Sequence, residues 1–107
     1  MEEVVVFDTI ESAQKTIPSG QQRLVRIGQR NICLVNWQGT FYAVENACPH
    51  MGHPLSQGTL NPFQEIVCPL HTYRFHLKTG EEAERRCKDL QTYQVLQEEK
   101  LVIVLDQ

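Results

Sequence analysis

Residues 48–71 read CPHMGHPLSQGTLNPFQEIVCPLH, and this stretch decides how the rest of the chain is interpreted. It begins with CPH at residues 48–50 and ends with CPLH at residues 68–71, and 17 residues separate His50 from Cys68. Thiolate sulfur and neutral imidazole are side-chain donors that bind iron and zinc tightly. The stretch therefore predicts a metal centre with four candidate ligands, which are Cys48, His50, Cys68 and His71.

Both Cys-and-His pairs lie among residues that favour turns. Pro49 and Pro69 follow the two cysteines directly and fix the backbone angle φ there, while Gly52, Pro54 and Gly58 follow the first pair. A Cys and a His so close together in a regular helix or strand would not point at one small inorganic unit. We therefore expect two rigid loops, which lower the entropy cost of bringing the ligands together.

The motif and its surroundings resemble the Rieske-type 2Fe-2S proteins, whose pattern is C-x-H followed at a similar distance by C-x-x-H. The match extends over residues 48–55, Gly58, residues 68–71, Phe75 and residues 79–80. The resemblance implies one 2Fe-2S cluster. It also implies an all-β fold, namely a small antiparallel β-sandwich or barrel (the Rieske-like, ISP fold).

The resemblance further implies that Cys48 and Cys68 hold one iron and that His50 and His71 hold the other. Two ferric ions, two sulfides and two thiolates give a neutral oxidised core, which accepts an electron more readily than an anionic core with four thiolates. Replacing two cysteines by histidines accordingly moves reduction potentials from about −400 mV to roughly −150 to +300 mV. We expect the histidine-bound iron to face solvent, where an electron can leave.

Four positions differ from the high-potential members of this family. Those members carry a bridging cysteine in each ligand loop and hydroxyl donors from Ser and Tyr after the second His. Here His53 and Leu70 occupy the bridging positions, and Tyr73 and Phe75 occupy the Ser and Tyr positions. The chain is thus similar to a low-potential soluble ferredoxin of the ring-hydroxylating oxygenase type, with no catalytic residue of its own.

Two functions are compatible with this resemblance. The first is a one-electron carrier between a flavin- or NADH-dependent reductase and a terminal oxygenase. The second is a Rieske-like small subunit of a nitrite reductase or of another multi-subunit reductase. Many such nitrite-reductase subunits lack the four ligands, so their presence here favours the carrier, which is not an enzyme.

Other interpretations of the same residues stay open. A structural zinc could be held by the same two cysteines and two histidines. A catalytic Cys-His dyad needs one pair, whereas this chain has two in similar turn settings. His53 and His76 are better interpreted as surface or loop residues than as ligands. Met51, Pro54 and Leu70 are either ordinary loop residues or an apolar docking rim beside the ligands.

The chain has four cysteines, which in a secreted protein would indicate two disulfides. No export signal is visible, because the apolar runs Val4–Phe7 and Leu101–Leu105 are far too short for a signal peptide or a membrane span. Cys33 lies in an apolar run and Cys87 in a charged loop, so we interpret both as structural or incidental.

The formal net charge of −3 offers no basic patch for nucleic acid. We expect a monomer in the cytoplasm that contacts neither nucleic acid nor membrane. At 107 residues we expect one domain, 1–107, with an inserted cluster-binding subdomain at approximately 46–80.

Short runs of β-branched and aromatic residues predict an antiparallel meander outside the metal motif. Gln38-Gly39 predicts a tight hairpin turn, and residues 97–99 a second one. Asp8 is expected to cap a helical turn over residues 8–16, with Glu11 three residues on. Strands are expected at Val4–Phe7, Arg23–Ile27, Asn31–Trp37, Thr40–Glu45, Glu65–Val67, Tyr73–Leu77, Asp89–Leu96 and Lys100–Leu105.

Overall fold

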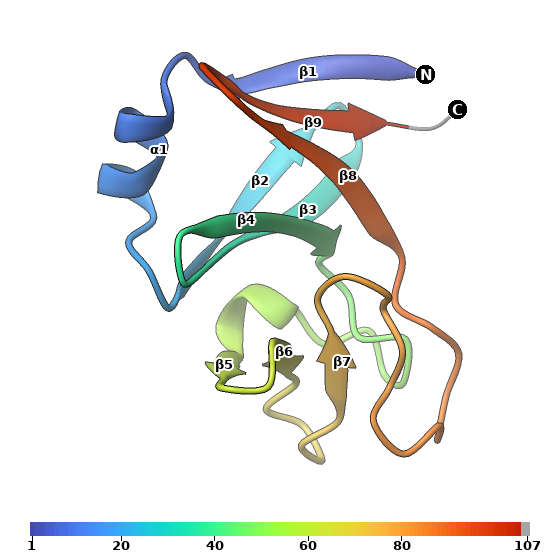
Figure 1. The fold of residues 1–107 in the computed structure, drawn as a ribbon. Helices are drawn as coiled ribbons and strands as arrows, with labels where there is room; N and C mark the ends of the chain where they lie inside the picture. Colours follow the sequence, from blue (N-terminus) through green and yellow to red (C-terminus); the bar gives the residue numbers. More distant parts are fainter. Residues whose placement is uncertain (106–107) are drawn as a thin grey trace.

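The computed structural model describes residues 1–105, so the last two residues of the predicted domain 1–107 lie outside the described residues. A six-stranded antiparallel sheet has the order β1-β9-β8-β4-β3-β2, and a three-stranded sheet has the order β5-β6-β7 (Figure 1). The predicted all-β, antiparallel class is confirmed. The elements are β1 Glu2–Phe7, α1 Ile10–Thr16, β2 Gln21–Ile27, β3 Arg30–Trp37, β4 Thr40–Glu45, the 3-10 turn η1 Leu55–Gln57, β5 Thr59–Asn61, β6 Glu65–Val67, β7 Arg74–His76, β8 Thr92–Gln97 and β9 Leu101–Leu105.

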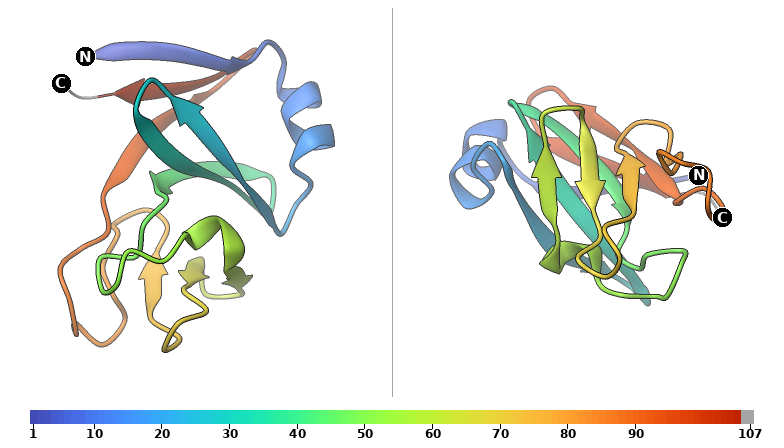
Figure 2. Two further views of the ribbon diagram at one scale, coloured as in Figure 1. Left: turned by 180° about the vertical axis from the view of Figure 1, so that it is seen from behind. Right: turned by 90° about the horizontal axis from the view of Figure 1, so that it is seen from below.

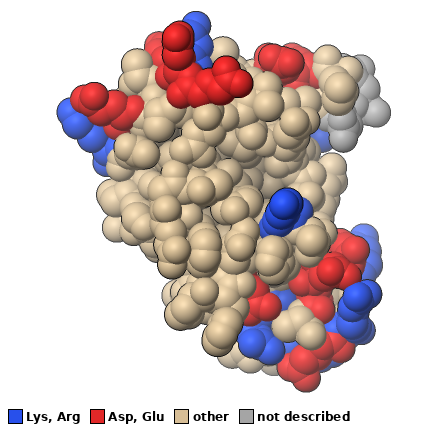
Figure 3. Space-filling model, viewed as in Figure 1, with Lys and Arg blue, Asp and Glu red and all other residues tan. Residues whose placement is uncertain are grey.

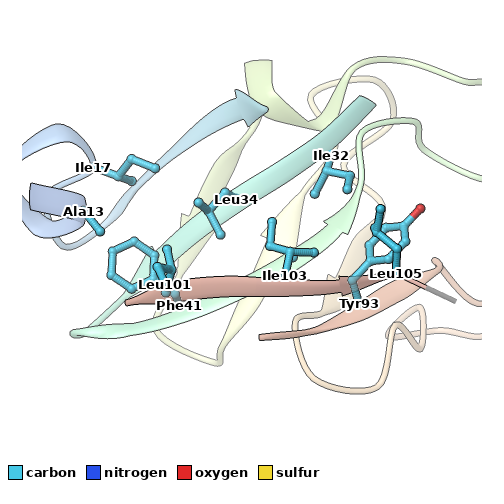
Figure 4. Packing of buried hydrophobic residues seen from close by; sticks show 10 residues of the cluster. Ala13, Ile17, Ile32, Leu34, Phe41, Tyr93, Leu101, Ile103 and Leu105 are labelled. Carbon is cyan, nitrogen blue, oxygen red and sulfur yellow. The ribbon is translucent and has the colours of Figure 1, made fainter. Parts of the chain in front are cut away.

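Strand β3 is buried on both faces because its alternate residues enter two different cores. Ile32 and Leu34 lie in the core enclosed by the six-stranded sheet and α1. Figure 4 shows Leu34 near Ile103 of β9 and the two buried residues of the helical segment. Cys33 and Val35 point the other way, into a second core. The apolar run of β3 is therefore the wall shared by the two parts of the molecule.

The second core lies between this wall and the three short strands. Seen from below, β5, β6 and β7 run side by side across the larger sheet (Figure 2). Leu55, Ile66 and Phe75 are fully buried there. Two polar contacts join the layers, because the Trp37 indole N–H donates to the Asn61 carbonyl (2.9 Å) and the Gln64 amide to the Tyr42 hydroxyl (2.7 Å).

The predicted Gln38-Gly39 hairpin is confirmed. Both residues have positive φ, 52° and 91°, which gives the two-residue turn that suits the twist of the flanking strands. The predicted helix start is wrong by one residue, because Thr9 rather than Asp8 accepts the Ser12 N–H (3.0 Å). Thr9 has the extended backbone of an N-cap residue. Within residues 1–105, no helix has the length and apolar character needed to cross a membrane.

The strand predictions fail at two places. The short strand β5 was not expected, because its three residues carry little apolar pattern. It forms where Gly58 lets the chain approach β6 so closely that a Cβ would collide with the Val67 carbonyl. Residues 89–91 were expected in a strand, yet β8 begins at Thr92. Leu90 instead lies in the second core, and its N–H donates to Gly80 (2.8 Å).

Candidate metal centre

Backbone hydrogen bonds fix the shape of both ligand loops. The Cys48 N–H donates to the His53 carbonyl (2.9 Å), and the Gly52 N–H donates back to the Cys48 carbonyl (2.6 Å). In the second loop, the Cys68 N–H donates to the Tyr73 carbonyl (2.8 Å). Each loop is thus closed by the amide of its own cysteine, as the turn-rich sequence predicts.

Left-handed residues complete the reversal of each loop. Gly52 has a φ of 76°, and His71 and Thr72 have φ of 67° and 54°. Residues other than glycine adopt this region at some cost, and they keep it only where the surroundings hold them. Two adjacent left-handed residues therefore turn the chain sharply between Cys68 and the start of β7.

Asn46 ties the first loop to the larger sheet. Its N–H donates to the Asn31 carbonyl at the start of β3 (2.9 Å), and its side-chain oxygen accepts the Ser56 N–H (2.7 Å). Because Asn46 is nearly buried, these bonds have little competition from water. The loop that carries Cys48 and His50 consequently starts from a fixed point.

The two cysteines of the motif lie together inside the protein. Cys48 and Cys68 are 1% and 0% exposed, and both belong to the second core. Burial raises the pKa of the Cys68 thiol, and so does the neighbouring Cys48 side chain, while a hydrogen bond from the Leu70 backbone N–H lowers it. A metal ion would deprotonate both thiols and supply the positive charge that burial otherwise denies them.

The two histidines of the motif lie together on the outer side of this site. The ring centres of His50 and His71 are 5.2 Å apart in an edge-on arrangement, and His71 is exposed. The Nδ1 atom of His50 is buried, yet it has no hydrogen-bond partner within residues 1–105. A buried polar atom left unpaired usually has a binding role, and a neutral imidazole nitrogen is a good metal ligand.

These donors fit a binuclear cluster. Sulfur lies beside sulfur and imidazole beside imidazole, as a cluster with two ligands on each iron requires. Nowhere in residues 1–105 do three or more His, Cys, Asp or Glu side chains gather around one position for a metal ion. The structure thus brings Cys48 to Cys68 and His50 to His71, as two pairs.

The other predicted residues take different places. Met51 is 63% exposed, whereas Pro54 and Leu70 are partly buried. His53 contributes its carbonyl to the first loop. His76 lies on β7, where its Nδ1 accepts the Lys78 N–H (3.1 Å).

The two remaining cysteines also differ from one another. Cys33 is fully buried in β3, and burial raises its pKa to about 12, so it behaves as a small apolar side chain. Cys87 is half-buried against the second core. Burial raises the pKa of Cys87, and the nearby Cys48 raises it further. No pattern in the sequence indicates that residue 87 approaches the first ligand loop.

Tyr73, Glu82 and Arg86 lie beside the centre, and the sequence does not predict a role for them. Tyr73 was singled out only because it occupies the position of a serine hydroxyl donor. The Tyr73 ring is stacked on His50, with ring centres 4.1 Å apart and planes at 16°. The Arg86 guanidinium covers the same Tyr73 ring, 3.8 Å from its centre, and pairs with buried Glu82 (2.9 Å). The four-residue spacing of Glu82 and Arg86 was visible in the sequence, but their contact with Tyr73 was not.

The chain matches the Rieske [2Fe-2S] domain over residues 9–94, and it belongs to this family. The family match implies one 2Fe-2S cluster as the prosthetic group. This agrees with the arrangement of paired sulfur and nitrogen donors described above.

Two relatives illustrate the range of proteins that contain such a domain. The chain is 38% identical over 80 residues to the ferredoxin component of the naphthalene 1,2-dioxygenase/salicylate 5-hydroxylase systems of Ralstonia sp, a match that covers 74% of this chain and 76% of the relative. It is 36% identical over 77 residues to apoptosis-inducing factor 3 of Homo sapiens. That match covers 69% of this chain but only 13% of the human protein.

A solved structure confirms the fold. The chain is similar to one chain of the complex of reduced oxygenase and oxidised ferredoxin in carbazole 1,9a-dioxygenase. The TM-score is 0.77 at 28% identity, and the match covers 94% of this chain and 91% of that chain. The expected Rieske-like arrangement of strands is therefore present.

Proposed function

We propose that this chain is a one-electron carrier in which Cys48 and Cys68 bind one iron of the cluster and His50 and His71 bind the other. The observation that supports this most is the sorting of donors, with two thiols buried together and two imidazoles together toward the surface. The bound cluster supplies reversible one-electron chemistry. The chain contributes ligands, shielding and a route to the surface.

The residues around the sulfur side exclude water. Cys48 and Cys68 are packed among apolar side chains such as Leu55 and Ile66, so the thiolates have a low-dielectric setting. The Leu70 N–H directed at the Cys68 sulfur disperses part of its negative charge. The exposed ring of His71 offers the shortest way out for an electron.

We propose that electrons arrive from a flavin- or NADH-dependent reductase and leave to a terminal oxygenase. The support is the likeness to the ferredoxin component of a dioxygenase system and to a chain of an oxygenase–ferredoxin complex. A carrier must leave one partner to reach the next, which suits a monomer whose large exposed apolar residues are few. All four cysteines are free, which suits the reducing cytoplasm.

The docking surface is proposed to be the apolar rim beside the histidines, formed by Met51, Pro54 and Leu70. Redox encounters usually bury less than about 1,200 Å², so a single exposed apolar side chain contributes a large share of the contact. Met51 is the best test because Leu70 is partly packed into the second core. Figure 3 shows that charged side chains gather over the loop between β7 and β8, on one side of the molecule.

Metal analysis tests the function itself. Purified protein should be red-brown, with about two irons and two acid-labile sulfides per chain. Stoichiometric zinc without visible absorbance, from cells supplied with ample iron, would reject the carrier in favour of a structural module.

Stopped-flow transfer to an oxygenase tests the docking rim. Met51→Glu should slow second-order electron delivery several-fold while the visible spectrum stays unchanged. Phe63→Glu is the matched control, because Phe63 is 72% exposed on the turn between β5 and β6. Equal rates for wild type and Met51→Glu would remove the rim from the interface.

A further inference from the structure

A column of stacked side chains leads from the protein surface to His50. It consists of the Arg86 guanidinium, the Tyr73 ring and the His50 ring. Arg86 lies 3.8 Å from the Tyr73 ring centre, and the Tyr73 and His50 ring centres are 4.1 Å apart. The positive charge is therefore at most about 8 Å from the centre of the His50 ring.

Glu82 fixes the outer end of this column. Its carboxylate accepts the Arg86 backbone N–H (2.7 Å) and two guanidinium N–H groups (3.2 and 2.9 Å). The Glu82 side chain is fully buried, and its backbone bridges to Phe75 of β7. Charge-assisted bonds of this number hold a guanidinium in one orientation, so Arg86 is not a freely moving surface side chain.

The inner end of the column constrains His50. The two rings are nearly parallel, at 16°, so the Tyr73 face limits rotation of the imidazole about its own bonds. A cation against the Tyr73 ring adds to this contact, because the ring face is electron-rich. This contact restricts the direction of the His50 Nδ1 atom, which has no hydrogen-bond partner among residues 1–105.

A fixed cation near a redox centre also favours the reduced form. An added electron is attracted by a positive charge at this distance, although water around the Arg86 side chain, which is 33% exposed, screens part of the attraction. The carboxylate of Glu82 offsets part of this attraction. The net effect still depends on the guanidinium, because it lies directly against the ring that touches His50.

We propose that Tyr73 and Arg86 are positioning residues for His50, and that the stacked guanidinium raises the reduction potential of the cluster. This inference rests on the proposed binding of one iron by His50. It assigns a purpose to the tyrosine found where other family members carry a hydroxyl donor: it transmits a charge through its ring face.

Protein-film voltammetry on the cluster-loaded protein tests the charge. Arg86→Gln should lower the equilibrium constant for one-electron reduction about tenfold, which corresponds to about 59 mV. Arg85→Gln is the matched control, because it makes the same charge change at the adjacent residue, which is 75% exposed and pairs with Glu81 instead. Its shift should stay below about twofold. Equal shifts in the two variants, or none in Arg86→Gln, would overturn the proposal.

Two further variants test the ring. Tyr73→Phe keeps the stacked face and should keep both the potential and the electron paramagnetic resonance spectrum of the reduced protein. Tyr73→Leu should lower the potential and broaden that spectrum, because the His50 ring gains freedom. Identical spectra and potentials for Tyr73→Phe and Tyr73→Leu would contradict the positioning role.

Iron and sulfide content distinguishes a failure of this proposal from a failure of the proposed electron-carrier function. Wild type with a full cluster and variants without the expected shifts would reject the column alone. Wild type without iron would reject the carrier itself. If Arg86→Gln fails to load its cluster, the Tyr73→Phe and Tyr73→Leu pair still decides.

Discussion

The two parts of the molecule are held together in different ways. The larger sheet encloses an apolar core to which paired strands contribute in continuous register, as in β8 and β9. The part that carries the four ligands has a core of its own, but its loops depend on left-handed residues and on single polar side chains such as Asn46. We therefore expect the first part to fold by burying its own side chains and the second part to gain order from the cluster that it binds.

Replacing one proposed sulfur ligand should produce the largest difference in stability between the two parts. In Cys68→Ser we expect complete loss of the cluster and fast hydrogen exchange at β6 and β7, while β3 and β9 stay protected. Iron analysis and exchange mass spectrometry measure both effects. Cys33→Ser makes the same change at another buried cysteine and should keep its colour. Slow exchange at β6 and β7 in the cluster-free variant would show that the second part folds unaided.

A cavity in the core of the larger sheet should lower the stability of the protein and leave the cluster unchanged. Ile103 is fully buried in β9, and Ile103→Ala should lower the free energy of unfolding by about 2–5 kcal/mol. The midpoint potential should not move, because this core is separated from the ligands by β3. Urea unfolding and voltammetry on one preparation give both numbers. A shifted potential in the folded variant would mean that the two parts are mechanically coupled.

The free energy of unfolding at acidic pH should depend on the ion pair between Glu82 and Arg86. The Arg86 guanidinium lowers the pKa of the Glu82 carboxyl from about 4.5 to about 2. Because the pKa is depressed in the folded state, this stabilisation is present above about pH 4.5 and is lost as the pH falls toward 2. Water around the partly exposed Arg86 screens the pair, so this stabilisation is smaller than the roughly 3 kcal/mol that the pKa shift alone corresponds to.

Glu82→Gln tests this acid dependence. The variant should unfold more easily than wild type at pH 7, and the difference should close near pH 2. The exposed pair Glu81–Arg85 provides the control, since Glu81→Gln should change stability by less than about 0.5 kcal/mol. A difference between Glu82→Gln and wild type that is constant with pH would contradict the ion-pair account.

The smallest contrast concerns the absolute potential. We expect a midpoint reduction potential of about −150 mV, at the low end of the range for such clusters. Tyr73 and Phe75 stand where high-potential members have hydroxyl donors, and the Leu70 N–H is the backbone donor seen at the Cys68 sulfur. Voltammetry at neutral pH decides it. A midpoint well above zero would mean that other donors compensate for the missing hydroxyls.

The sequence predicted the strands of the larger sheet better than the region of the ligand loops. Runs of β-branched and aromatic residues identified β3 and β4, and Gln38-Gly39 identified their hairpin, because these depend on neighbours in the chain. Strand β5 depends on the close approach allowed by Gly58, which no local pattern reports. The stacking of Tyr73 between His50 and Arg86 likewise joins three separate segments. The four proposed ligands could be named from the sequence because metal-binding motifs have a recognisable spacing of Cys and His.

Mössbauer spectroscopy of protein enriched in 57Fe tests the central claim most directly, since it reports the surroundings of each iron. The pairing of Cys48 with Cys68 and of His50 with His71 predicts two different iron environments in equal amounts, one with sulfur ligands only and one with nitrogen ligands. His71→Ser should alter the second environment and leave the first. A single environment for both irons in the wild-type protein would contradict the account.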